Sequence, residues 1–128
     1  MDAWRISASG LGAQWKRMRV IGSNVSHSET TRTSGGGAYR KHYPVFSATL
    51  EDVSGVQYEG SREARKPTRT VYAPDDPRAG EDGKVTEPNV SLPLQTRDMI
   101  SARQAYKANV RAMKQFKKLC QKTLKLRG

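Results

Sequence analysis

Both ends of the chain carry apolar residues at alternating steps of three and four positions. This heptad spacing places one apolar stripe along a helix, which is typical of a face that packs against another helix. Near the N-terminus the heptad stripe consists of Trp4, Ala8, Leu11, Trp15, Met18, Gly22 and Val25. Near the C-terminus it consists of Leu92, Gln95, Met99, Ala102, Tyr106, Asn109, Met113, Phe116, Cys120 and Thr123. The pattern therefore predicts helices in residues 1–27 and 92–128.

The two predicted helices differ in intrinsic strength. Gly10, Gly12 and Gly22 weaken the first, because each glycine costs about 0.8–1 kcal/mol relative to alanine in a helix interior. No Gly or Pro interrupts residues 94–127. An isolated helix as short as the first is marginal in water. We therefore expect the first helix to be ordered only where another element covers its heptad stripe.

The middle of the chain, residues 28–91, is rich in Gly, Pro, Ser, Thr and charged residues. Short strands are predicted at 43–50, 53–58 and 68–72, with turns at Ser54-Gly55 and Glu59-Gly60-Ser61 and an irregular ordered loop at 74–89. This is enough for a hairpin or small sheet but not for an independent domain. The predicted fold is mainly α: two terminal helices pack as a coiled-coil-like bundle in an assembly, with a small β or extended insert between them.

Charge is concentrated in the last quarter of the chain. The 128 residues carry a net charge of +11, and residues 97–128 alone carry +9. Six cations gather opposite the heptad stripe, at about 100° per residue. We call them the basic stripe: Lys107, Arg111, Lys114, Lys118, Lys122 and Lys125. A second, weaker apolar strip runs through Ala105, Ala108, Ala112, Leu119 and Leu126.

Three roles for the basic stripe remain open: a solvated or partner-paired face, a surface for nucleic-acid phosphates, or a surface for an anionic membrane. The first is favoured. Tyr106 and Phe116 lie in the heptad stripe, where they could not stack on bases. The second apolar strip also lacks the aromatic anchors that are typical of interfacial helices.

Several classes of chemistry find no support in the sequence. Cys120 is the only cysteine, which excludes an internal disulfide and a cysteine-based zinc site. The acidic residues of 75–82 do not have the spacing of a calcium loop. No nucleophile motif or phosphate-binding loop occurs. No apolar run is long enough to span a bilayer, and the first residues are too polar for a cleaved signal peptide. We expect no enzyme, metal or cofactor.

Three separated groups of residues resemble motifs of the bacterial flagellar rod and hook protein family. The first comprises Ile6-Ser7-Ala8-Ser9-Gly10-Leu11, Ala13-Gln14, Arg17-Met18, Val20-Ile21, Asn24 and Thr30-Thr31. The second resembles the loop of the proximal-rod subunit and comprises Tyr72, Pro74, Pro77, Ala79, Gly83, Val85 and Pro88-Asn89-Val90. The third comprises Met99-Ile100-Ser101-Ala102-Arg103, Ala105-Tyr106 and Ala108-Asn109-Val110. The chain departs from the family at residues 32–37 and in its strongly basic end.

The resemblance implies a structural subunit of the periplasmic part of the flagellar basal body, the proximal rod. It implies helical assembly through the terminal helices, transmission of motor torque, and passage through the flagellar type III export apparatus without cleavage of a signal peptide. The implied partners are further copies of the chain, other rod subunits and the rod base, with the surrounding ring proteins as a further candidate. No specific nucleic acid is expected. The alternatives are a nucleic-acid-binding protein that uses the basic helix, and a sibling rod subunit.

The same resemblance, together with the heptad stripe, predicts an assembly interface on both helices. On the first helix the predicted interface residues are Ile6, Leu11, Trp15, Met18, Ile21 and Asn24. On the second they are Met99, Ile100, Tyr106, Asn109, Val110, Met113 and Phe116. The apolar members would exclude water, and the two asparagines would fix register by requiring hydrogen-bond partners. The basic stripe would face either a central channel or an acidic sibling subunit.

Overall fold

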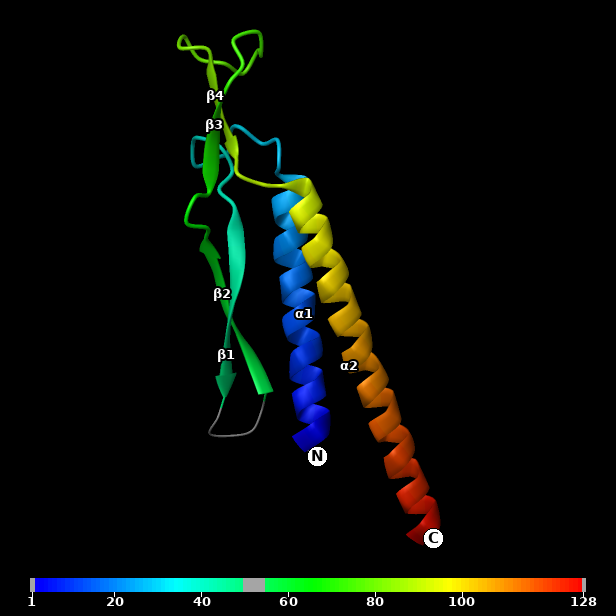
Figure 1. The fold of residues 1–128 in the computed structure, drawn as a ribbon. Helices are drawn as coiled ribbons and strands as arrows, with labels where there is room; N and C mark the ends of the chain where they lie inside the picture. The colour runs from blue at the N-terminus through cyan, green and yellow to red at the C-terminus, as the bar shows by residue number, and fades with distance from the viewer. Residues whose placement is uncertain (1, 50–54, 128) are drawn as a thin grey trace.

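The computed structural model describes residues 2–49 and 55–127 (Figure 1). Two terminal helices run antiparallel along each other, and the strands between them form an insert on one side. In chain order the elements are α1 (Asp2–Ser26), β1 (His42–Thr49), β2 (Gly55–Glu63), β3 (Thr68–Tyr72), β4 (Lys84–Pro88) and α2 (Leu92–Arg127). The predicted mainly α fold with a small β insert is confirmed.

α1 lies in the middle of the molecule and is covered from two directions. α2 packs along one face of α1, and the β1–β2 hairpin packs along another (Figure 1). Among the described elements, α2 contacts α1 and none of the strands. The cover that the glycine-weakened helix was expected to need is thus supplied, at least in part, by its own chain. The antiparallel two-helix packing is the intrachain unit of the predicted bundle.

β1 and β2 form an antiparallel hairpin whose register runs from His42↔Glu63 to Thr49↔Gly55. The turn predicted at residues 59–61 is wrong, because these residues lie inside β2. The partner of Pro44 is Ser61 and that of Phe46 is Tyr58, so β2 contains one extra residue, a β-bulge. Gly60 (φ 105°) supplies the backbone conformation that the bulge requires. Leu50 and residues 53–54 of the predicted strands and turn lie outside the described residues.

β3 and β4 form a second antiparallel hairpin, with Thr68 opposite Pro88 and Tyr72 opposite Lys84. β3 matches the predicted strand, but the loop predicted for residues 74–89 is too long, because 84–88 form β4. The sequence signal for this strand is weak, since Val85 is the one β-branched aliphatic residue among several charged and polar neighbours. The hairpin projects beyond the end of the helix pair where α1 ends and α2 begins (Figure 1).

The buried interior is small. Among the described residues, the buried apolar side chains are Ala13, Ile21, Val85, Pro88, Val90 and Ala102. Many larger apolar side chains remain exposed, including both tryptophans. No helix within residues 2–49 and 55–127 is both long enough and apolar enough to cross a membrane. Many large apolar side chains of the described residues are therefore left uncovered by the single chain.

Candidate assembly surface

The heptad stripe of α2 faces α1 over most of its length. Ala102 is fully buried and Gln95 nearly so, while Met99, Tyr106 and Met113 are half-buried. The cations on the opposite side of the helix are exposed. The three-four spacing thus correctly predicted which side of α2 packs on a helix, because that spacing keeps the same side turned toward the neighbour.

The heptad stripe of α1 is only partly used inside the chain. Trp4 contacts α2 through its ring, whose centroid lies 6.3 Å from that of Phe116. Trp15, in the same stripe, is 54% exposed. α1 also buries Ala13, which lies outside the stripe and lines the contact with β2. α1 packs against α2 on one side and against the β1–β2 hairpin on another, so its buried residues do not follow a single stripe.

Gly10 allows the two helices to approach closely. A Cβ atom built on Gly10 would lie 3.0 Å from Nδ2 of Asn109. The Asn109 amide also donates a hydrogen bond of 3.1 Å to the carbonyl of Ala105 in its own helix. Gly12, two residues away, has nothing within 4 Å of the equivalent position. Gly10 therefore has a packing role that a count of helix-weakening glycines does not reveal.

Asn24 joins the end of α1 to the start of β1. The residue is 2% exposed. Its Nδ2 donates to the carbonyl of His42 at 2.7 Å, and its Oδ1 accepts from the His42 N–H and the Tyr39 hydroxyl, each at 3.1 Å. The Tyr39 ring stacks on His27 with a centroid separation of 4.7 Å. The hydrogen bonds that Asn24 was expected to need are made within the chain.

Ser9 and Lys16 of α1 contact the first residues of β2. The Ser9 Oγ accepts a hydrogen bond of 3.1 Å from the N–H of Val56. Gly55 (φ 90°) starts β2 directly beside Ser9, where an added Cβ would collide with the Ser9 Oγ. Lys16 Nζ lies 5.6 Å from the centre of the Tyr58 ring, within range of a cation–π contact. These contacts fix where the hairpin lies along the helix.

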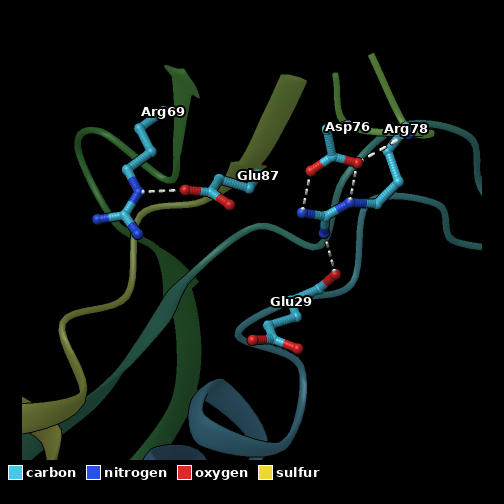
Figure 2. Close-up of polar contacts among 5 residues, drawn as sticks. All are labelled: Glu29, Arg69, Asp76, Arg78 and Glu87. Carbon is cyan, nitrogen blue, oxygen red and sulfur yellow. Dashed lines mark hydrogen bonds and ion pairs between the residues drawn. The ribbon is translucent and has the colours of Figure 1, made fainter. Parts of the chain in front are cut away.

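Figure 2 shows how the loop after β3 is connected to the segment after α1. The Arg78 guanidinium donates to both carboxylate oxygens of Asp76, at 2.8 and 3.1 Å, and to the backbone carbonyl of Glu29 at 3.2 Å. The hydrogen bonds from the side chain and backbone N–H of Arg78 lower the pKa of Asp76 from 3.8 to about 2. Nearby, Arg69 pairs with Glu87 across β3 and β4 at 2.8 Å. The acidic loop is thus organised by its own arginine.

The remaining polar features of this loop are also local. The Asp82 carboxylate accepts a hydrogen bond of 3.1 Å from the N–H of Lys84, at the turn that leads into β4. Within the described ranges, no group of three or more His, Cys, Asp and Glu residues is arranged to hold a metal ion.

The predicted interface residues fall into three classes of burial. Ile21 and Asn24 are buried within the chain, whereas Ile6, Trp15 and Ile100 are exposed. The half-buried residues are Leu11, Met18, Met99, Tyr106, Asn109, Val110, Met113 and Phe116. The exposed class is available to a neighbouring subunit without any change in the fold. The role of the whole set in an assembly stays a prediction.

The basic stripe is exposed along its length. All six of its side chains belong to exposed residues of α2. The ion pairs found in residues 2–49 and 55–127 join Arg40 to Glu63, Arg69 to Glu87, Arg78 to Asp76 and Arg97 to Asp98. None of them includes a member of the stripe, so its positive charge is not compensated by direct ion pairs there.

Sequence reasoning missed the residues that position the insert. Ser9, Tyr39 and Arg78 each make a contact with a residue at least 15 positions away. A serine, a tyrosine and an arginine carry no local signal of such contacts. The pairing of Asp76 with Arg78, two residues apart in a proline-bounded loop, is the one contact that sequence spacing suggests.

Several known proteins are similar in sequence to nearly the whole of this chain. No protein-family model matches it. The flagellar basal-body rod protein FlgC of Aquifex aeolicus (strain VF5) is 37% identical over 126 residues, covering 95% of this chain and 92% of the relative. FlgC of Salmonella typhimurium is 31% identical over 129 residues, covering 98% and 96%. FlgC of Bacillus subtilis (strain 168) is 31% identical over 140 residues, covering 94% and 93%.

Proposed function

Since this chain belongs to the FlgC family of flagellar basal-body rod proteins, it has a structural role in the rod, and we propose that it assembles there helically through its two terminal helices to transmit motor torque. Helical assembly needs a contact that joins different surfaces of neighbouring copies and does not close into a ring. Torque is then shared by many apolar contacts and hydrogen bonds between subunits, and no residue needs a catalytic role.

The observation that carries this proposal is the apolar surface left on the helices. Trp15, Ile6 and Ile100 are exposed on α1 and α2, while few apolar side chains of the described residues are buried. Exposed apolar surface of this kind marks sites of protein–protein contact. The comparisons support a rod subunit, and nothing favours the nucleic-acid alternative.

The partners and location follow from the same proposal. The chain contacts further copies of itself and other rod subunits, with the rod base and ring proteins as additional neighbours. It reaches the periplasmic rod through the flagellar type III export apparatus without loss of a signal peptide. In the assembled rod, the basic stripe faces either the central channel or an acidic neighbouring subunit, because uncompensated cations on adjacent helices would repel one another.

The test is complementation of a bacterium from which the gene for this chain has been deleted. A tagged chain should restore swimming and copurify with isolated basal bodies. Trp15→Gln should abolish most of the swimming, because it removes an exposed ring from the proposed interface. Val71→Gln removes an exposed apolar side chain from β3 and should leave swimming near normal. Absence of the tagged chain from basal bodies would refute the proposal.

A further inference from the structure

The fold separates the charges of the middle segment into two places. Residues 28–91 contain nine Arg and Lys residues and ten Asp and Glu residues, so the segment is nearly neutral as a whole. The backbone brings the start of β1 beside the end of β2, since Lys41 accepts a hydrogen bond of 2.8 Å from the Ala64 N–H and donates one of 3.1 Å to the carbonyl of Pro67. We call the cations at this junction the basic waist: Lys41, Arg62, Arg65 and Lys66.

The basic waist forms no ion pair within the part of the chain that the structure describes. All of its members except Lys41 are exposed. The adjacent carboxylate of Glu63 is already paired with Arg40, at 2.9 Å. Like charges confined to one end of a hairpin repel one another, and an anionic partner would remove that repulsion. The basic waist therefore fits an acidic surface of another molecule.

An acidic surface lies at the end of the β3–β4 hairpin. Residues 74–83 contain four carboxylates and one arginine. That arginine, Arg78, pairs with Asp76 (Figure 2). The three other carboxylates belong to exposed residues and to none of the ion pairs of the described chain, and we call them the acidic tip: Asp75, Glu81 and Asp82. The acidic tip thus has the charge that the basic waist lacks.

One chain cannot bring its own acidic tip to its own basic waist. The whole of β3 separates them, and its five residues span about 17 Å at 3.4 Å per residue. In Figure 1 the loops between β3 and β4 form the far end of the insert, whereas the connection from β2 to β3 lies between the two hairpins.

We infer that the acidic tip of one copy binds the basic waist of a second copy. A lengthwise displacement by about one β3–β4 hairpin would bring the two surfaces together, with the inserts in line. The basic stripe lies on α2, on the far side of α1 from the insert, so this displacement would not bring it to the tip (Figure 1). The two surfaces are different, so the contact can repeat from copy to copy without closing a ring. The inference rests on the proposed function and names surfaces through which copies meet.

Charge reversal tests this contact in the deletion strain, and the measurement is the amount of tagged chain in isolated basal bodies. The tip variant is Asp75→Lys with Glu81→Lys, and the waist variant is Arg65→Glu with Lys66→Glu. All four positions are exposed. Each variant alone should lower the incorporated chain at least about tenfold, because like charges then face one another. A chain that carries both variants should recover most of this loss, since the two surfaces again have opposite charge.

The matched control combines the tip variant with Lys114→Glu and Lys118→Glu, which reverse two cations of the basic stripe. No recovery is expected there, and recovery would overturn the inference, because the acidic tip would then meet α2 of a neighbour. Incorporation that neither reversal changes, or that folded chains with both reversals do not recover, would overturn it as well.

Disulfide cross-linking decides the question if a reversal removes the helical circular dichroism of the chain. Two differently tagged copies, both with Cys120→Ser, carry Glu81→Cys and Lys66→Cys. Mixed dimers should form at least about tenfold more than with Ala108→Cys in place of Lys66→Cys. Equal yields would overturn the inference. If the unsubstituted tagged chain restores no swimming and is absent from basal bodies, the proposed function is wrong, and the inference falls with it.

Discussion

Two stretches of α2 share one sequence pattern but differ in what covers them. From Leu92 to Phe116 the heptad stripe lies against α1, and its members are mostly buried or half-buried. In residues 117–127, the α2 overhang, the stripe continues through Cys120, which is half-buried, and Thr123, which is exposed, and the leucines and lysines beside the stripe are exposed as well. α1 has 25 residues and α2 has 36, so the shorter helix cannot cover the longer one. A heptad pattern thus predicts a packing face, while helix length decides how much of that face remains for other chains.

The largest expected effect comes from breaking the covered stretch. Ala102→Asp places a carboxylate at a fully buried position, and it should lower the free energy of unfolding by about 3 kcal/mol or more. Ala108→Asp, at an exposed position of the same helix, should change it by less than about 0.5 kcal/mol. Urea unfolding followed by circular dichroism distinguishes the two. Similar losses in both variants would mean that α2 is not packed on α1 in solution.

Removal of the Asn24 side chain tests how the β insert is attached to α1. Asn24→Ala leaves the His42 backbone groups without their side-chain partner and removes one of the two hydrogen bonds of the Tyr39 hydroxyl, so it should destabilise the chain by about 2–3 kcal/mol. Tyr39→Phe removes the hydrogen bonds of its hydroxyl to Asn24 and Ser23 but leaves the His42 contacts in place, and should cost about 1 kcal/mol. Thermal unfolding of the two variants shows which substitution lowers the stability more. Equal effects would show that the tyrosine, and not the asparagine, holds β1 to α1.

A smaller change in stability is expected when two glycines of α1 are replaced by alanine. Gly12→Ala should raise stability by about 0.8–1 kcal/mol, because the added methyl group meets open space and alanine favours the helix. Gly10→Ala should lose this gain, since its Cβ presses on Asn109 across the helix contact. The double variant Gly10→Ala with Asn109→Ala should recover part of it. Identical unfolding midpoints for Gly10→Ala and Gly12→Ala would rule out the close helix approach.

The smallest effect concerns the loop after β3, which is remote from both stretches of α2. Because the pKa of Asp76 is about 2 in the folded chain and 3.8 ordinarily, its ion pair stabilises the folded loop above pH 3.8. This contribution is lost as the pH falls through about 2. Nuclear magnetic resonance of the Asp76 carboxyl carbon should show a midpoint near 2, which Arg78→Ala shifts toward 3.8. A midpoint near 3.8 in the unaltered chain would mean that the pair does not form.

The helices and the packing side of α2 could be predicted because their signals are local. The three-four spacing repeats over ten positions of α2, from Leu92 to Thr123, and nothing interrupts it. β4 could not be predicted, because a strand with one aliphatic residue is defined by its pairing with β3 and not by its own pattern. The bulge at Gly60 resembled a turn for a similar reason, since glycine with polar neighbours is typical of both.

The candidate site was predictable in outline only. Spacing identified which residues lie on the packing stripes, but not which of them the chain itself would bury. Asn24 became internal because β1 begins beside the end of α1, and that placement depends on contacts between distant residues. The exposure of the α2 overhang depends on the difference in length between two helices at opposite ends of the sequence.

Hydrogen exchange along α2 measures the difference between its two stretches most directly. In the dilute chain, backbone amides from Gln95 to Met113 should exchange more slowly than those of residues 119–127. In isolated basal bodies, both stretches should be protected, because in the proposed assembly a neighbouring subunit covers the α2 overhang. Equal protection of the two stretches in the dilute chain, or an overhang that still exchanges freely in the basal body, would contradict the claim that α2 is completed by a neighbour.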